Sequence, residues 1–321
     1  MNAKGSDQKM MEFFITRSVG DSLKKIDVLE KKAWINLIDP TEEELNYLQE
    51  TLNILPNFLR DPLDEEERPR IDIEDDQKLI IVDIPIVYDT EEALRFETIP
   101  LGILVLDEHI LTICLKESPI IEDFKNRKVR DLYTFMKTRF TLQILQSVAS
   151  AYLKDLKHID KKTEAIEKSL HKSTGNEEVF KQLELEKGLV FFRTSLKSNE
   201  IVMEKLLRWK HLRMYEEDQD LLEDVIIENK QAIEMANIYS SILNSMMNAF
   251  ASIISNNLNI VMKFLTAVTI VLSIPTMIYS MYGMNVTLPL QYNSMGFTYV
   301  IIISIVTALI TARWLVKKGM F

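Results

Sequence analysis

Small polar side chains form a regular stripe along an otherwise apolar segment near the C-terminus. Serine, threonine and asparagine recur there at alternating intervals of three and four residues, interrupted by one methionine. The stripe consists of Ser241, Ser245, Asn248, Ser252, Ser255, Asn259, Met262, Thr266, Thr269, Ser273, Thr276 and Ser280. This spacing places the stripe on one face of a helix and predicts a left-handed supercoil with partner helices. Oxygen atoms on such a face could line a hydrated lumen or allow close helix packing, and the lumen requires several copies of the chain.

The sequence carries none of the common catalytic or nucleotide-binding signatures. Its four histidines form no HExxH motif, its eight glycines form neither GxGxxG nor GxxxxGK[ST], and GxSxG is absent. The single cysteine, Cys114, cannot form an intramolecular disulfide, and no Cys/His cluster has the spacing of a structural zinc site. We therefore expect neither an enzyme nor a resident cofactor.

Charge disappears from the chain after residue 234. Between Glu234 and Arg313 the only charged residue is Lys263. This stretch contains two apolar runs, 264–282 and 297–316, each long enough to cross a hydrocarbon core of about 30 Å as a helix. A buried hairpin in a large soluble core is the alternative, but such cores seldom require two runs of this length. We therefore predict two transmembrane helices with a lipid bilayer as their partner.

The basic residues that flank the two runs predict how the chain crosses the bilayer. Lys263 precedes the first run, whereas Arg313, Lys317 and Lys318 close the second. Because cytoplasmic segments carry an excess of lysine and arginine, both termini are expected in the cytoplasm and the loop 283–296 outside. The sequence therefore predicts a multi-pass protein of the plasma (inner) membrane.

Negative charge accumulates in the part that precedes the apolar runs. All 48 acidic side chains of the protein lie within residues 1–262, and the whole chain carries a formal net charge of −10. This balance disfavours nucleic acid and anionic lipid headgroups as partners and is compatible with cations. Most individual carboxylates are expected to be part of an ordinary solvated surface.

Proline placement divides residues 1–262 into two parts. Seven of the nine prolines lie between residues 40 and 119, and none follows until Pro275. Asp39, Pro40 and Glu42 predict a helix start with Asp39 as the N-cap. Apolar runs between turn residues predict strands at 34–38, 78–87, 98–106 and 110–115, with a hairpin turn at 107–109. The first part is therefore expected to be mixed α/β.

From about residue 120 onward the pattern is helical. Breaks near 173–176 and 215–220 predict an antiparallel pair of helices, followed by one helix from about 218 to 281 that is roughly 95 Å long. The predicted fold class is an α/β cytoplasmic domain, an all-helical part with a very long stalk helix, and two C-terminal transmembrane helices. The expected boundaries are an α/β domain at 1–118, a helical hairpin region at 119–216, a stalk that continues as the first transmembrane helix at 217–282, an external loop at 283–296, a second transmembrane helix at 297–316 and a basic cytoplasmic tail at 317–321.

The first apolar run ends in Tyr282-Gly283-Met284-Asn285, and here the sequence resembles the CorA family of divalent-cation channels. The signature of that family is YGMN at the outer end of the first of two C-terminal spans. Pro275 and Thr276 precede the motif, and the C-terminal residues 317–321 are similar to the family's basic and aromatic tail. The order of α/β domain, helical hairpin, long helix and two spans covers essentially the whole chain.

The Gly-Met-Asn residues also have a physical interpretation without the family name. In one chain, Gly283 and Asn285 are ordinary helix-ending residues. Repeated around a symmetric pore, Asn285 would provide a ring of neutral amide oxygens, and glycine would let backbone carbonyls approach the axis. Mg²⁺ loses its water reluctantly, so neutral oxygens that hydrogen-bond its water shell are a plausible filter for the hydrated ion.

The resemblance implies a homopentamer that conducts Mg²⁺, and also Co²⁺ and Ni²⁺. Its filter would be Gly283, Met284 and Asn285, with Asn285 at the outer mouth. The pore below would be lined by Asn259, Met262, Leu265 and Thr276, and the polar stripe adds Thr266, Thr269, Ser273 and Ser280. Because relatives often carry Met where this chain has Ser273, we expect the dry constriction at Leu265 and Met262 instead.

The resemblance also implies regulation by Mg²⁺ bound between the cytoplasmic domains of neighbouring subunits. Mg²⁺ would then be both substrate and regulatory ion. Asp224 matches the stalk carboxylate of the family best, and Asp220 and Glu223 are close seconds. The partner carboxylate is expected among Asp72, Glu74, Asp75 and Asp76.

Two other functions fit parts of the sequence. A zinc transporter of the same fold would share the two spans, although related zinc transporters usually alter GMN. A membrane-anchored coiled-coil scaffold or sensor would explain the stalk and spans, but it gives no reason for YGMN beside a polar stripe. Entry of Mg²⁺ into vesicles that contain the pure protein distinguishes a channel from the scaffold. Competition between metal ions in the same vesicles distinguishes the magnesium channel from the zinc transporter.

Overall fold

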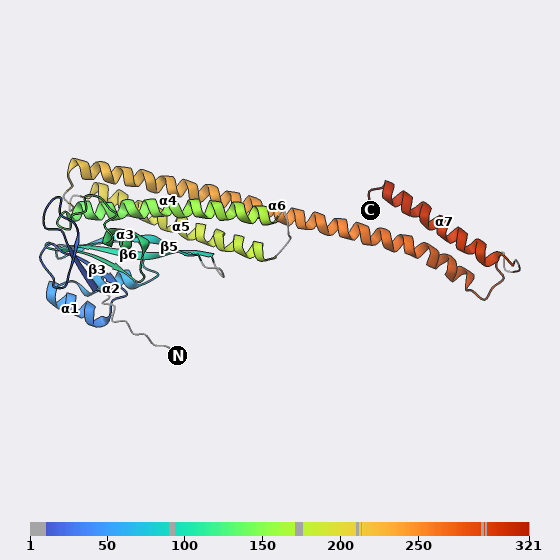
Figure 1. Cartoon of the computed structure of the whole chain (residues 1–321), viewed down its shortest axis with the longest axis horizontal. Helices are drawn as coiled ribbons and strands as arrows, with labels where there is room; N and C mark the ends of the chain where they lie inside the picture. The colour runs from blue at the N-terminus through green and yellow to red at the C-terminus, as the bar shows by residue number, and fades with distance from the viewer. Residues whose placement is uncertain are drawn as a thin grey trace. The chain divides into compact units, whose positions relative to one another are not determined.

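A computed structural model describes residues 11–89, 94–170, 176–209, 212, 214–289, 292 and 294–320 of the 321-residue chain. The chain divides into two compact units, Met1–Asn244 and Ser245–Phe321. The first unit contains a sheet with helices on both faces, and the second contains two apolar helical segments (Figure 1).

The secondary structure follows the predicted order. The strands are β1 (Met11–Ile15), β2 (Lys24–Ile26), β3 (Trp34–Ile38), β4 (Arg70–Glu74), β5 (Gln77–Asp89), β6 (Leu94–Val105) and β7 (Ile110–Cys114). The helices are α1 (Glu42–Leu52), α2 (Pro56–Arg60), the 3₁₀ turn η1 (Asp61–Leu63), α3 (Pro119–Lys125), α4 (Lys137–Leu170), α5 (Asn176–Arg208), α6 (Glu216–Tyr282) and α7 (Gly296–Lys317). The four predicted strands and the hairpin turn are confirmed, whereas the strands β1, β2 and β4 and the short helix α2 were not predicted. The helical region expected from about residue 120 is divided into α3 and α4.

The seven strands among the described residues form one mixed sheet in the order β2-β1-β3-β7-β6-β5-β4. The described pairs are antiparallel except β3 and β7, which run parallel with Leu37 beside Ile113. Their residues are almost all buried, as expected for central strands that are covered on both faces. The hairpin of β5 and β6 is the longest pairing and extends beyond the end of β4.

The start of α1 corrects one sequence prediction. The N-cap is Thr41, not Asp39: the Thr41 hydroxyl accepts a hydrogen bond from the Glu44 N–H, and the Glu44 carboxylate accepts one from the Thr41 N–H. This reciprocal pair is a capping box. Asp39 has a left-handed backbone with φ of 46° and precedes Pro40, which disfavours a helical conformation at the residue before it. The helix therefore begins two residues later than a cap at Asp39 would require.

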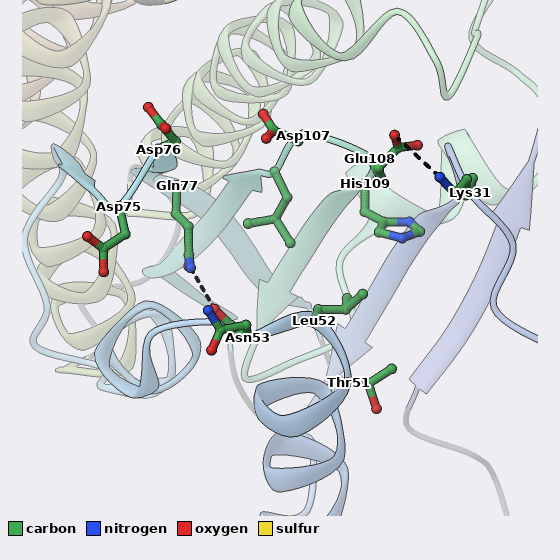
Figure 2. Close-up of a pocket in the computed structure, with 11 residues that line it drawn as sticks. Lys31, Thr51, Leu52, Asn53, Asp75, Asp76, Gln77, Asp107, Glu108 and His109 are labelled. Carbon is green, nitrogen blue, oxygen red and sulfur yellow. Dashed lines mark hydrogen bonds and ion pairs between the residues drawn. The ribbon is translucent and has the colours of Figure 1, made fainter.

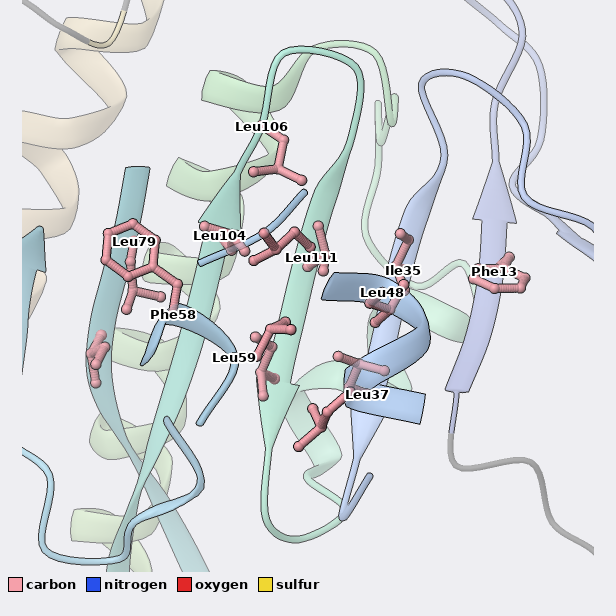
Figure 3. Packing of buried hydrophobic residues seen from close by; sticks show 14 residues of the cluster. Phe13, Ile35, Leu37, Leu48, Phe58, Leu59, Leu79, Leu104, Leu106 and Leu111 are labelled. Carbon is pink, nitrogen blue, oxygen red and sulfur yellow. The ribbon is translucent and has the colours of Figure 1, made fainter. Parts of the chain in front are cut away.

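One face of the sheet forms the main hydrophobic core with α1 and α2. Figure 3 shows Leu48 of α1 and Phe58 and Leu59 of α2 gathered over sheet residues such as Leu37 and Leu111. All five side chains are buried. Burying each such side chain contributes roughly 1.5–3 kcal/mol, so this face holds the two short helices against the sheet.

The opposite face of the sheet packs against α3 and α4 through aromatic side chains. Trp34 alternates with the core residues of β3 and therefore points away from α1. Its ring lies 4.9 Å from that of Phe14, 6.4 Å from Phe124 of α3 and 5.2 Å from Phe140 of α4. The Trp34 indole N–H donates a 2.8 Å hydrogen bond to the hydroxyl of Thr112, so its one polar atom is satisfied.

Buried amide side chains connect the helices of the first unit. Asn229 of α6 donates a 2.9 Å hydrogen bond to the carbonyl of Leu196 on α5. Gln182 of α5 donates a 3.0 Å hydrogen bond to the carbonyl of Leu243 on α6. Because an unpaired buried polar group is costly, these bonds fix how α5 lies along the first part of α6.

The long helix and the apolar C-terminal helix are both present as predicted. α6 has 67 residues and is therefore about 100 Å long, and α7 has 22 residues. Both are long and apolar enough to cross a membrane, and only 6% of the apolar window in α6 and 17% of that in α7 are buried. A helix of a soluble core would be mostly buried, so this exposure favours a lipid environment. The predicted boundaries between domains stay predictions.

Candidate cation pathway

The residues of the predicted filter follow directly after the end of α6. The Gly283 N–H donates to the carbonyls of Tyr279 at 3.0 Å and Ser280 at 3.2 Å, which closes the last turn. Gly283 does not adopt the left-handed conformation that favours glycine, and a Cβ atom there would meet nothing closer than 3.5 Å. Neither backbone conformation nor space within one chain therefore requires glycine here.

Gly283 and Met284 line a cavity of about 590 Å³ in the second unit, whereas Asn285 is exposed beside it. The cavity lies between the end of α6 and the start of α7. Aromatic and aliphatic side chains line most of it, among them Tyr279, Tyr282, Val286, Phe297, Val300 and Ile301. The sequence alone did not predict this cavity. Its walls come from the end of α6 and the start of α7, and the apolar residues there are of the same types as those in the rest of the two helices.

The polar stripe lies on an exposed face of α6 in the single chain. The eight candidate pore residues are all exposed: Asn259, Met262, Leu265, Thr266, Thr269, Ser273, Thr276 and Ser280. Buried and half-buried residues of the same part of α6 lie on the opposite face, at Ala267, Val271, Ile274 and Ile278. A turn of 100° per residue separates the centres of the two faces by about half a circle. The polar stripe is therefore not used for packing within the second unit.

Hydroxyl groups of the stripe donate hydrogen bonds to backbone carbonyls of α6, and their oxygen atoms can still accept hydrogen bonds at the surface. Thr269 donates to the carbonyl of Leu265 at 2.8 Å, Ser273 to Thr269 at 2.7 Å and Thr276 to Leu272 at 2.9 Å. Each hydroxyl proton is thus directed along the helix. A hydroxyl oxygen has two acceptor lone pairs, so these groups can accept hydrogen bonds from the water around a cation.

The packed side of α7 carries small residues. Gly296 and Ser304 are buried on α7, with Val300 between them at the same four-residue spacing. On α6, Ala267 is also buried. Small residues allow close approach of transmembrane helices, so α7 is suited to support α6 from the side opposite the polar stripe.

The predicted regulatory carboxylates lie at the start of α6. Asp220, Glu223 and Asp224 are all exposed, whereas Asp218 is buried and ion-paired with Arg139 of α4 at 3.3 Å. Within the described part of the chain, no group of three or more His, Cys, Asp or Glu side chains could hold a metal ion. One protomer therefore provides exposed carboxylates but no complete metal site, and a bound ion would need ligands from a second chain.

The candidate partner carboxylates on β4 are not equivalent. Asp72 is ion-paired with Arg70 at 2.5 Å, and Arg70 also contacts Glu67 and, at 2.6 Å, Asp61. Partial burial raises the pKa of Asp61, although Arg70 opposes this shift. The sequence did not reveal this cluster, because its acids surround Arg70 from three separate places in the fold. Asp72 is therefore engaged within its own chain.

Asp75 and Asp76 lie in the turn between β4 and β5 and line a cavity of about 450 Å³ (Figure 2). Asp107, Glu108 and His109 from the turn between β6 and β7 line the same cavity. His109 is buried, and this burial lowers its pKa. As predicted, His109 is a turn residue, and no described group of carboxylates beside it could hold a metal ion.

A family model described as "CorA-like Mg2+ transporter protein" matches residues 30–318. The chain belongs to the CorA family. It is 32% identical over 288 residues to the "Cobalt/magnesium transport protein CorA" of Methanocaldococcus jannaschii, and this match covers 86% of the chain and 87% of that protein. The likeness thus extends through both the first unit and the predicted spans.

Solved structures of a CorA protein and of CmaX have the same fold. The complete structure of the CorA magnesium transporter from Methanocaldococcus jannaschii matches with a TM-score of 0.81 and 28% identity, over 95% of this chain and 96% of that one. The full-length CmaX structure matches with a TM-score of 0.70 and 13% identity, over 99% of each chain, and so shares the fold. These matches confirm the predicted fold class and the resemblance to the CorA family.

Proposed function

We propose that several copies of this chain form a membrane channel for divalent cations, with Mg²⁺ as the main substrate. The observation that carries the proposal is the intact Tyr-Gly-Met-Asn sequence at the end of a helix whose polar face is exposed, opposite the face packed within the second unit. Membership of the CorA family and the names of its relatives as magnesium and cobalt transport proteins support this substrate class. Co²⁺ and Ni²⁺ would be further substrates.

The polar stripe gives the proposal its mechanism. In a homopentamer, the exposed faces of five copies of α6 would surround an axis, with Asn285 at the outer mouth. The amide oxygens would accept hydrogen bonds from the water shell of Mg²⁺, which the ion gives up reluctantly. Below them, Thr276, Ser273 and Thr269 would continue the path with hydroxyl oxygens whose protons are already used within the helix.

Leu265 and Met262 are proposed as the closed gate. Their side chains are more than half exposed in the single chain, on the same face as the polar stripe. Rings of such apolar side chains can gate a pore by excluding water rather than by binding the ion. Lys263 and the basic tail would lie at the cytoplasmic end, with both termini inside and the membrane being the plasma (inner) membrane.

Regulation by cytoplasmic Mg²⁺ is proposed at the exposed carboxylates of α6. Asp224 is the first choice, with Asp220 and Glu223 beside it. Because Asp72 is occupied by Arg70, the partner from a neighbouring subunit is better sought at Glu74, Asp75 or Asp76. An ion held between two chains would stabilise the closed arrangement and would be lost when internal Mg²⁺ falls.

The decisive experiment is ion flux in vesicles that contain the purified full-length protein. We expect Mg²⁺ entry that Co²⁺ and Ni²⁺ reduce by competition. Zn²⁺ entry driven by a proton gradient, without Mg²⁺ entry, would instead support the zinc transporter. Absence of flux for each of these metals, with the oligomer intact, would support the scaffold or sensor.

A further inference from the structure

The cavity between the β4–β5 turn and the β6–β7 turn contains a buried polar atom without a partner. His109 is only 6% exposed, and its Nδ1 atom has no hydrogen-bond partner among the described residues. The side chain forms part of the cavity wall, as Figure 2 shows. Because an unpaired buried polar atom is costly, the cavity favours a ligand that supplies the missing hydrogen bond.

The protonation state of His109 indicates what kind of ligand fits. Burial lowers its pKa, although the Ala33 carbonyl and the charge of Glu108 act in the opposite direction, so the ring is mostly neutral at pH 7. A neutral imidazole has one nitrogen that donates and one that accepts. With the proton on Nε2, Nδ1 accepts a hydrogen bond. The ionised carboxylates of the cavity have no proton to give, so the donor must come from the ligand.

Carboxylates from both turns line the same cavity. Asp75 and Asp76 come from the β4–β5 turn, where both have a left-handed backbone, and Asp107 comes from the β6–β7 turn. Among the described residues, none of these three side chains forms an ion pair, whereas Glu108 lies 3.8 Å from the Lys31 amine. The cavity therefore offers carboxylates that are free to bind a cation.

Two further lysines lie near the turns, but their amines bind backbone carbonyls. Lys137 donates 2.5 Å hydrogen bonds to the carbonyls of Leu106 and Asp107, and Lys78 donates one of 3.5 Å to the carbonyl of Asp76. Neither lysine lines the cavity, whose lining has four acidic side chains and one lysine. This excess of negative charge attracts cations.

The shape of the cavity favours an elongated cation over a single ion. Within the described part of the chain, no three His, Cys, Asp or Glu side chains are placed to hold a metal ion. The cavity of about 450 Å³ is instead within the usual size range of small-molecule sites, and Leu52 and Leu106 add apolar surface to its lining. A ligand with a cationic group at each end and an apolar middle matches these features.

We propose that this cavity binds a linear aliphatic polyamine. One ammonium group binds the acids of the β4–β5 turn, and another binds those of the β6–β7 turn. The methylene groups between them lie against the two leucines, and one N–H of the ligand donates a hydrogen bond to Nδ1 of His109. This site is additional to the proposed cation pathway and does not depend on it.

Calorimetric titration of the purified full-length protein with spermidine tests the site. We expect saturable binding that weakens as the ionic strength rises. Asp75→Asn and Asp107→Asn should each lower the affinity about fivefold, which corresponds to the upper value for a partly exposed ion pair. Both side chains are exposed, so neither substitution should disturb folding. Glu43→Gln, at an exposed position on α1 outside the cavity lining, is the matched control and should bind as the wild type does.

Simpler cations test whether both ends of the ligand are recognised. Diaminobutane has two ammonium groups, whereas butylamine has one on a chain of the same length. Butylamine should therefore bind about fivefold more weakly than diaminobutane, because it reaches the acids of only one turn. Mg²⁺ tests whether positive charge alone is sufficient, and at equal concentration and ionic strength it should not displace spermidine.

Nitrogen NMR of the full-length protein with labelled histidine tests the hydrogen bond to His109. Spermidine should shift the Nδ1 resonance of His109, which is identified by its loss in His109→Gln. The resonances of His158 should not move, because that side chain faces Asp89 and does not line the cavity. If His109→Gln does not fold, the resonance is identified instead as the one whose spermidine response is lost when Asp75→Asn and Asp107→Asn are combined.

The outcomes separate this proposal from the proposed function. Unchanged spermidine affinity in the combined variant, equal affinity for butylamine and diaminobutane, or displacement of spermidine by Mg²⁺ at equal concentration would each overturn the polyamine site. Spermidine binding that moves no histidine resonance would overturn the role of His109. Neither measurement uses ion flux, so a chain that conducts no cation could still bind the polyamine, and a conducting chain could fail to bind it.

Discussion

The hydroxyl of Thr269 donates a 2.8 Å hydrogen bond to the carbonyl oxygen of Leu265, one turn earlier in α6. The same pattern recurs at Ser273 and Thr276, so the polar face consists of hydroxyl oxygens whose protons point along the helix. Such a surface offers acceptors rather than donors. It therefore suits the outward-pointing hydrogen atoms of water around a cation better than it suits an anion.

Removing the side-chain amide of Asn285 should abolish uptake of Mg²⁺. Asn285 is exposed in a loop just after α6, so Asn285→Ala removes no buried contact and should leave the oligomer folded. We expect Mg²⁺ flux in vesicles to fall to the level of empty vesicles. Asn257→Ala is the matched control, because Asn257 is exposed on α6 away from the polar stripe. Normal flux through correctly assembled Asn285→Ala would refute the filter.

The apolar side chains at Leu265 and Met262 should determine how tightly the pore closes. Leu265→Ser replaces an exposed leucine by a residue that is easily hydrated, so it should increase leak at high internal Mg²⁺. Ser273→Met places a larger side chain two helical turns after Leu265, towards Tyr282, and should lower conductance instead. Both effects are measured as single-channel or vesicle flux. If Leu265→Ser closes as tightly as the wild type, the gate lies elsewhere.

Asp224→Asn should weaken closure by internal Mg²⁺ without unfolding the first unit. The side chain is exposed, and a site between chains would lose one carboxylate ligand. The Mg²⁺ concentration that protects the cytoplasmic part from protease should rise about tenfold, equivalent to about 1.4 kcal/mol of binding energy. The contrasting variant is Asp218→Asn, which breaks a buried ion pair with Arg139 and should lower thermal stability instead. An unchanged protection midpoint in Asp224→Asn would exclude this residue.

Much of this architecture could be predicted because charge and spacing are visible in the sequence. The scarcity of charged residues on either side of Lys263 indicates the two apolar helices, and the stripe that contains Thr269 indicates the long helix. The residues from Tyr282 to Asn285 indicate the proposed filter. These features depend on single segments. Each segment carries its own pattern of apolar and polar residues, so no knowledge of its neighbours is needed.

Features that join distant segments could not be predicted in this way. Asn199 and Asp83 are 116 residues apart, and only the fold brings the side-chain amide of Asn199 to the backbone of Asp83 in β5. Asp61 and Arg70 form their ion pair only because the chain folds back between η1 and β4. The N-cap of α1 was misplaced for a local reason, because Asp39 and Thr41 are both good caps and the backbone before Pro40 decides between them.

The acid sensitivity of the first unit should depend on Glu12. Partial burial acts to raise the pKa of Glu12. Hydrogen bonds and charges from Lys125 and Lys25 together lower it by more than burial raises it, so the net shift is downward. The folded state therefore binds fewer protons than the unfolded chain near pH 4. This contribution to stability is present at neutral pH and is lost as the pH falls through the folded pKa.

Glu12→Gln tests this contribution directly. At pH 7 the variant should be less stable by up to about 1 kcal/mol, the usual upper value for a partly exposed ion pair, because it loses the charge that pairs with Lys125 and Lys25. The difference from wild type in thermal unfolding should shrink as the pH falls through the folded pKa of Glu12, because the wild-type carboxylate then becomes protonated as well. Glu50→Gln, at an exposed position on α1, is the control and should show no such convergence. A stability difference for Glu12→Gln that stays constant from pH 7 to pH 3 would show that the loss comes from packing rather than from the charge paired with Lys125 and Lys25.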